Sequence, residues 1–197
     1  MRTFIIILFI TAIATSYSQT DNDTTYRVEI STTASSSINF FRDERYPGGS
    51  SGNSLGYGVF IRGMWHPGRR LAVGLMTGYS FVVGDEFTVD SIYSTQSGDQ
   101  ASANLAAIPL QLAVSMQYKG LEIGVGMGPY LMLTTIDYGS TAKAQRIELG
   151  ITFIGLYRFP LGENFSLGPE LRVLYLSYRG IISIMPSVTL QIDLWIY

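Results

Sequence analysis

The chain has 197 residues, of which 47% are hydrophobic and 14% are charged, against roughly a quarter charged in an ordinary soluble domain. Its net charge of −2 provides no basic patch for nucleic acid, and the absence of cysteine removes disulfides and thiolate metal ligands. The length predicts a single domain, and the nucleic-acid-binding class is excluded.

The one long apolar block opens the chain, in MRTFIIILFITAIATSYSQ. Arg2 precedes an apolar core, and Ser16 and Ser18 stand at the −3 and −1 positions of a cleavage site before Gln19. The core is too short to span a membrane, since a spanning helix needs about 20 residues. The pattern therefore predicts a cleaved signal peptide over residues 1–18 and an exported domain over residues 19–197.

After the signal peptide, apolar residues alternate with small or polar ones, which is the period of half-buried β-strands. The pattern is clearest in IPLQLAVSMQYKGLEIGVGMGPY, where Lys119 and Gly120 separate two alternating runs. Many runs reach the ten or so residues that a tilted strand needs to cross a bilayer. The predicted strands are Thr25–Phe41, Ser54–Trp65, Arg70–Val83, Ala103–Tyr118, Leu121–Ile136, Gln145–Phe159, Asn164–Ser177 and Ser183–Tyr197.

Long connections alternate with short ones along the chain. RDERYPGGSSGN, GDEFTVDSIYSTQSGDQ, DYGSTAKA and the shorter YRGII alternate with the tight turns HPGR, KG and PLGE. Outer-membrane barrels place long loops outside the cell and short turns in the periplasm. The sequence thus predicts an all-β fold: an eight-stranded antiparallel up-and-down transmembrane β-barrel, with residues 42–53 and 84–100 among its extracellular loops.

Nearly all charges within the predicted strands share one face. These residues are Arg27, Glu29, Arg62, Glu122, Glu148, Arg158, Glu170, Arg172 and Asp193. A soluble ligand-carrying barrel would turn such a face to water, whereas a membrane barrel turns it inward. The membrane barrel is favoured because only Lys119 and Lys143 supply lysine, whereas a water-facing surface is rich in lysine and glutamate. In an eight-stranded barrel these charges are expected to pair across a filled lumen.

Aromatic residues gather near the ends of the predicted strands and are expected to form girdles at the two membrane interfaces. They are Tyr26, Tyr57, Trp65, Tyr79, Tyr118, Tyr157, Phe159, Trp195 and Tyr197.

Nothing in the sequence indicates catalysis, a cofactor or a regular metal site. The single histidine, His66, is interpreted as a turn residue beside Pro67 and Gly68. The acidic residues Asp85, Glu86, Asp90 and Asp99 could bind Ca²⁺ or bridge lipopolysaccharide, but solvation is the favoured interpretation because they lack ligand spacing. The sequence predicts a protein that is not an enzyme.

The motifs IPLQL and GLEIGVGMGPYL, with the signal ending SYSQ, resemble an outer-membrane β-barrel family common in Bacteroidetes, akin to PorT-like and OmpX-like small barrels. The resemblance covers Thr25 to Tyr197 and implies fold and location, without functional residues. The expected role is structural or adhesive, through surface loops; the alternatives are an accessory barrel of a secretion or assembly machine, or a narrow pore. Expected partners are outer-membrane lipid, lipopolysaccharide and the barrel assembly machinery, with a monomeric protein and an unknown extracellular partner.

Overall fold

The computed structural model describes residues 26–40, 55–68, 70–88, 100–138, 140–177 and 180–196. The predicted signal peptide and the predicted loop over residues 42–53 lie outside these ranges. Within them there is no helix that is long and apolar enough to cross a membrane.

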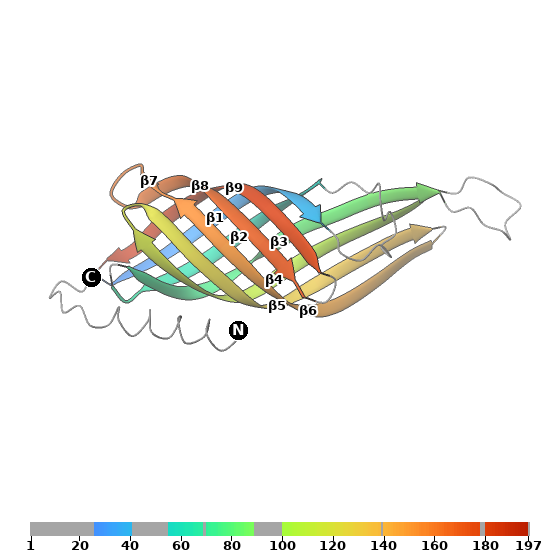
Figure 1. Ribbon diagram of the computed structural model, residues 1–197, viewed down its shortest axis with the longest axis horizontal. Coiled ribbons are helices and arrows are strands. Elements are labelled where there is room, and N and C mark those ends of the chain that lie inside the picture. The colour runs from blue at the N-terminus through green and yellow to red at the C-terminus, as the bar shows by residue number, and fades with distance from the viewer. Residues whose placement is uncertain are drawn as a thin grey trace, which may run out of the picture.

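Eight long strands form a closed antiparallel barrel, which confirms the predicted fold class (Figure 1). Each pairs with the next along the chain, and β1 pairs with β9. The two-residue strand β7 continues the line of β6 along β8, because Leu156 faces Glu170 and Phe159 faces Leu167 in one register. The strands are β1 Arg27–Phe40, β2 Leu55–His66, β3 Leu71–Thr88, β4 Gln100–Tyr118, β5 Leu121–Tyr138, β6 Ser140–Tyr157, β7 Phe159–Pro160, β8 Phe165–Leu176 and β9 Ile181–Ile196.

The two ends of the barrel differ. Arg27 at the start of β1 pairs with His66 at the end of β2 and with Ile196 at the end of β9. The same end, called the turn end below, carries the tight β4–β5 turn, where Lys119 and Gly120 have positive φ angles of 48° and 84°. The opposite end, where the longer connections lie, is called the loop end.

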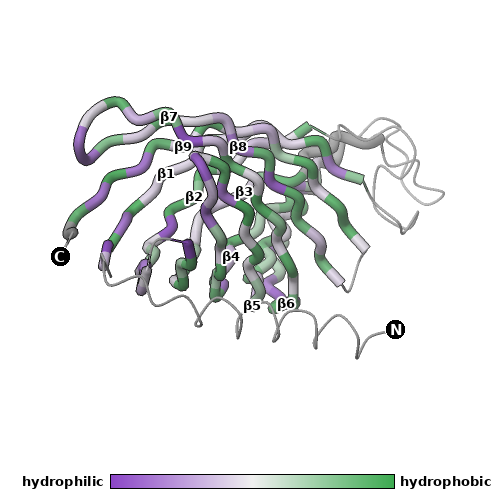
Figure 2. Tube along the Cα trace, turned by 60° about the vertical axis from the view of Figure 1, so that its left-hand side comes forward, coloured by the Kyte–Doolittle hydropathy of each residue, from purple (hydrophilic) through white to green (hydrophobic). Residues whose placement is uncertain are grey.

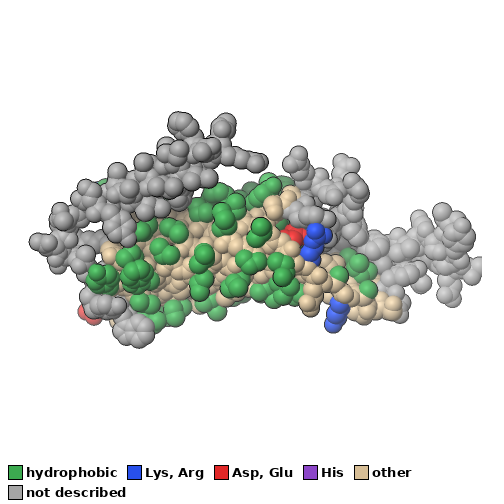
Figure 3. Space-filling model, turned by 90° about the horizontal axis from the view of Figure 1, so that it is seen from below, with side chains coloured by type: hydrophobic (Ala, Val, Ile, Leu, Met, Phe, Trp, Pro, Cys, Tyr) green, Lys and Arg blue, Asp and Glu red, His purple; other side chains and the backbone are tan. Residues whose placement is uncertain are grey.

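Side chains alternate between the barrel interior and its outer surface, and many large apolar side chains are exposed on the outside. Figure 2 shows hydrophobic and hydrophilic residues following one another along the strands. On β4, for example, Leu112 is 68% exposed whereas the neighbouring Gln111 is 0% exposed. The space-filling view shows hydrophobic side chains spread over the barrel wall, with Lys and Arg only towards one end of this face (Figure 3). The structure therefore has the inside-out arrangement of a membrane barrel, which turns its apolar surface to lipid.

Exposed aromatic side chains gather towards both ends of the wall. On β2, Tyr57 and Trp65 are eight residues apart and both exposed. At about 3.3 Å per residue and a tilt of about 40°, they are separated by roughly 20 Å of barrel height. Near the turn end lie Tyr26, Trp65, Tyr118, Tyr157, Phe159 and Phe165, and further along lie Phe40, Tyr57, Tyr79 and Tyr175. The side chains of Trp195 and Tyr197, also expected in a girdle, lie outside the described set.

Apolar side chains fill much of the interior towards the loop end. Phe60, Leu174 and Met185 belong to a buried cluster with seven further side chains. These are Val82, Leu105, Ala107, Tyr130, Met132, Leu176 and Ile181. A second buried cluster comprises Met64, Ala72, Met76, Ala113 and Ile154. The lumen therefore contains both apolar and charged side chains, whereas the sequence predicts an interior filled by charges.

Four strands extend beyond the position at which the sequence predicts loops. The predicted loop DYGSTAKA is strand on both sides of Gly139: β5 runs to Tyr138, β6 begins at Ser140, and Asp137 pairs with Thr141. Likewise β3 reaches Thr88 and β4 begins at Gln100, within the other predicted loop. Figure 1 shows these two hairpins projecting past the rest of the barrel. The polar composition of these segments predicts loops, but pairing with a neighbouring strand stabilises extended backbone there.

A pair of glycines provides a test of the packing inside the wall. A Cβ atom on Gly74 would lie 1.9 Å from the carbonyl oxygen of Gly63, whereas one on Gly63 would meet nothing within 4 Å. We expect Gly74→Ala to lower the free energy of unfolding by about 1–3 kcal/mol, because the neighbouring strand must move. Gly63→Ala should change it by less than about 0.5 kcal/mol. Urea unfolding of the two variants in lipid vesicles measures the difference, and equal stabilities would contradict this packing.

Candidate functional sites

A cluster of four buried charges lies in the interior near the turn end. The Arg158 guanidinium reaches both Glu29, with Nη1 2.7 Å from Oε2, and Glu122, with which its Nη2 is in close contact. Arg62 Nη1 lies 3.0 Å from Glu122 Oε1, and Arg62 Nε donates to the Ser31 hydroxyl at 3.2 Å. Strands β1, β2 and β5, and the residue after β6, are thus joined across the lumen.

The rim of this cluster is half-buried at the turn end. Arg27 lies 3.4 Å from both Glu29 and Asp193 and donates to the Gln117 side-chain oxygen at 2.9 Å. His66 is buried, and its Nε2 lies 3.2 Å from Glu29 Oε2. The interpretation of His66 as a turn residue is corrected: it ends β2 and its ring joins the interior cluster, because its even position continues the inward phase of that strand.

A second buried ion pair lies further from the turn end on β8. Arg172 donates to Glu170 Oε1 through Nε at 2.9 Å and Nη2 at 2.6 Å. Glu170 Oε2 accepts a hydrogen bond from the Thr189 hydroxyl at 2.8 Å. The guanidinium carbon of Arg172 lies 3.9 Å from the centre of the Phe60 ring, so this cation also borders the apolar cluster.

The last predicted interior charge, Glu148, is buried on β6 towards the loop end, and its Oε1 lies 3.9 Å from Nε of Arg146. Arg146 is not among the nine predicted interior charges, although its even number places it in phase with Glu148. The interior also holds a hydrogen-bonded chain from the Tyr130 hydroxyl through Thr152 to Gln111, with oxygen–oxygen distances of 2.7 and 2.8 Å, which the sequence does not predict. Uncharged polar residues carry no distinctive pattern that would have revealed this chain.

Together, the structure places seven of the nine predicted charges in the buried interior, with Arg27 and Asp193 at its rim. They fall into the turn-end cluster, the Glu170–Arg172 pair and Glu148. The described residues contain no group of three or more His, Asp or Glu that could hold a metal ion. The side chains of Asp85 and Glu86, like Asp90 and Asp99, lie outside the described set.

The projecting β5–β6 hairpin forms a different kind of candidate site, a strand edge. Among the described residues, β6 pairs with β8 over Gly150–Leu156, and the Leu149 carbonyl accepts a hydrogen bond from the Ser177 backbone N–H at 3.2 Å, so residues 140–148 pair with β5 alone. All side chains from Ser140 to Ile147 are exposed, on both faces of the strand. This segment, STAKAQRI, carries Lys143 and Arg146 and no acidic residue. It is called the β6 edge below.

These features define the class of the protein: a small eight-stranded transmembrane β-barrel. Solved outer-membrane barrels share the fold. Neisserial surface protein A is 12% identical over 85% of this chain and 97% of its own, with a TM-score of 0.54. Ail, the attachment invasion locus protein of Yersinia pestis, is 8% identical over 87% of this chain and 99% of its own, with a TM-score of 0.53.

At these identities the likeness shows the fold alone. No protein-family model matches the sequence, and no curated protein matches it in sequence. The resemblance to Bacteroidetes barrels stays a prediction.

Proposed function

We propose that the protein is an integral outer-membrane barrel whose turn end faces the periplasm and whose loop end projects from the cell. Its exposed apolar wall and the aromatic girdles near its two ends support insertion in a bilayer. The short turns at one end and the projecting hairpins at the other support this orientation, since outer-membrane barrels keep their short connections periplasmic. Export would depend on the signal peptide predicted over residues 1–18.

The proposed orientation predicts which ends of the barrel are accessible on intact cells. An epitope inserted at Gly139, between β5 and β6, should be labelled by antibody without permeabilising the cells. The same epitope after Pro67, between β2 and β3, should be labelled only after permeabilisation. The reverse labelling pattern would show that the barrel is inverted.

For its activity, we propose recognition of an external protein segment at the β6 edge. The observation that carries this proposal is an exposed strand segment of eight residues whose strand pairing, among the described residues, is with β5 on one side. Unpaired backbone N–H and C=O groups on such an edge can add a strand from another chain. The name of Ail refers to attachment, which is compatible with a surface recognition role for this fold.

The charge of the edge indicates the chemistry of the partner. Lys143 and Arg146 are exposed, and the segment Ser140–Ile147 contains no acidic side chain. Across a pair of strands, opposite charges stabilise and like charges destabilise. An extended segment with alternating acidic residues would therefore suit this edge better than a basic one. A pore receives less support, because side chains from both apolar clusters and the ion pairs occupy the interior.

The test uses the full barrel in lipid nanodiscs and two synthetic nine-residue peptides, one alternating Glu with Val and one alternating Lys with Val. We expect the acidic peptide to bind at least fivefold more tightly and to slow amide hydrogen exchange within Ser140–Ile147. A Lys143→Glu, Arg146→Glu variant should reverse the preference. Equal binding of both peptides, or protection confined to other strands, would refute recognition at this edge.

A further inference from the structure

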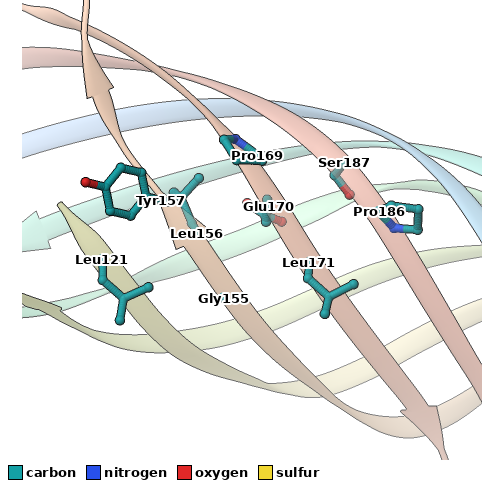
Figure 4. A pocket seen from close by; sticks show the side chains of 9 residues that line it. All are labelled: Leu121, Gly155, Leu156, Tyr157, Pro169, Glu170, Leu171, Pro186 and Ser187. Atoms are coloured by element: carbon teal, nitrogen blue, oxygen red, sulfur yellow. The ribbon is translucent and has the colours of Figure 1, made fainter.

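A shallow apolar groove lies on the outer wall across β5, β6, β8 and β9 (Figure 4). Its volume is about 310 Å³. Figure 4 shows Leu121 and Leu171 on either side of Gly155, where the absence of a side chain leaves the floor open. A Cβ on Gly155 would come no closer than 4.0 Å to another atom, the Leu171 carbonyl oxygen. Pro169 and Pro186 complete the apolar lining.

The groove lies within the lipid-facing band, just inside the aromatic girdle of the turn end. Tyr157, which lines the groove, lies two positions from Gly155 along β6 and makes an edge-on contact with Phe159, with ring centres 5.0 Å apart. Exposed tyrosine and phenylalanine mark the membrane interface on either side of this position. A groove at this depth adjoins the upper part of an acyl chain rather than the middle of the bilayer.

A pair of cations lies beyond the girdle, at the height of a lipid headgroup. The Tyr157 ring packs beside Gly120, where a Cβ would lie 3.7 Å from its Cζ. Gly120 follows Lys119, whose Nζ lies 5.3 Å from the centre of the Tyr118 ring. The guanidinium carbon of Arg70 lies 5.9 Å from the same ring. Basic side chains next to an apolar surface at the interface attract anionic lipid headgroups.

From this combination we infer that the groove binds one anionic phospholipid, with an acyl chain over Gly155 and its phosphate near Lys119. The groove supplies apolar contact for a chain, and Lys119 and Arg70 supply charge complementarity for the phosphate. A neutral phospholipid has the same chains but carries no net charge, so its attraction to these cations is weaker. The inference concerns the lipid-facing wall and does not depend on recognition at the β6 edge.

Native mass spectrometry of the full barrel released from nanodiscs of equal phosphatidylglycerol and phosphatidylcholine tests this site. We expect one retained phosphatidylglycerol per barrel, at least fivefold in excess over phosphatidylcholine. Gly155→Leu, which fills the groove, should reduce retention at least tenfold, and Lys119→Gln should lower the preference for phosphatidylglycerol. Gly63→Leu is the matched control, because Gly63 also faces outward with open space around it, and it should retain the lipid.

A mobility shift between boiled and unboiled samples first establishes that each variant is folded. The inference is overturned if the wild-type barrel retains no stoichiometric lipid, or if Gly155→Leu and Gly63→Leu retain it equally. It is also overturned if Lys119→Gln leaves the headgroup preference unchanged. A parallel sample with added lipid A distinguishes the source of phosphate: preferential retention of lipid A would contradict a phospholipid site.

Discussion

Arg172→Met is expected to lower the free energy of unfolding by about 3–5 kcal/mol, because removing one member of a buried ion pair leaves the other charge uncompensated. Arg172 donates two hydrogen bonds to Glu170, and both side chains are almost completely buried. Without the guanidinium, Glu170 keeps the Thr189 hydroxyl as a donor but loses its opposite charge. Equilibrium unfolding in urea, followed by the gel mobility of the barrel in lipid vesicles, measures the loss.

A double variant distinguishes the effect of the unpaired charge on stability from the effect of the lost packing. Replacing both members, with Arg172→Met and Glu170→Gln, should restore most of the lost stability, since no buried charge then remains in the pair. Arg70→Met serves as a control for arginine removal, because Arg70 is exposed at the turn end, and it should change the stability by less than about 1 kcal/mol. If the single and double variants are equally unstable, the ionic contact is not the cause.

Leu112→Arg is expected to lower the stability of the barrel in a bilayer by about 2–4 kcal/mol, the cost of arginine at the membrane midplane. Leu112 is exposed on β4 and lies on the apolar wall, opposite Leu75 and Met127 of the neighbouring strands. The fraction of protein that folds into phosphatidylcholine vesicles, read from the mobility of unboiled samples, should fall accordingly.

The matched control is Ala142→Arg, in the part of β6 that projects past the barrel. There the side chain meets water, so folding should remain close to that of the wild type. The alternation of the sequence would suggest that position 111, next to Leu112, tolerates arginine and could serve as the control. The structure shows that it cannot. Gln111 is buried, accepts a hydrogen bond from Thr152 and donates to the Gly150 carbonyl, so an arginine there would disrupt the interior. Equal folding of Leu112→Arg and Ala142→Arg would mean that the wall does not face lipid.

Much of the barrel could be predicted from the sequence because its two faces differ in polarity at every second residue. The tight turn at Lys119 and Gly120 lies where the sequence predicts it, and the start of β5 and the end of β4 match the predicted bounds. The inward phase of charged residues such as Glu122 and Arg62 also follows from alternation. One repeated two-residue period thus determines which side chains share the lumen.

Other features depend on contacts that a two-residue period does not encode. Val173 and Leu174 are adjacent and both apolar, so the phase of Glu170 and Arg172 places Leu174 inward, but its polarity does not reveal that an apolar cluster fills this part of the lumen. The segment Ser140–Ile147 is exposed on both faces, so it has no alternating pattern, and its strand depends on pairing with β5. The partners of each interior charge, such as Arg158 with both Glu29 and Glu122, depend on strand register across the lumen.

The most direct measurement of the central claim is the heat-dependent mobility of the protein in separated envelope fractions. A folded barrel in the outer membrane should remain in that fraction after washing with urea or alkaline carbonate. The unboiled protein should migrate differently from the boiled one, because a closed sheet resists unfolding in detergent at room temperature. Recovery of the protein in the soluble periplasmic fraction, with one mobility before and after boiling, would contradict a transmembrane barrel.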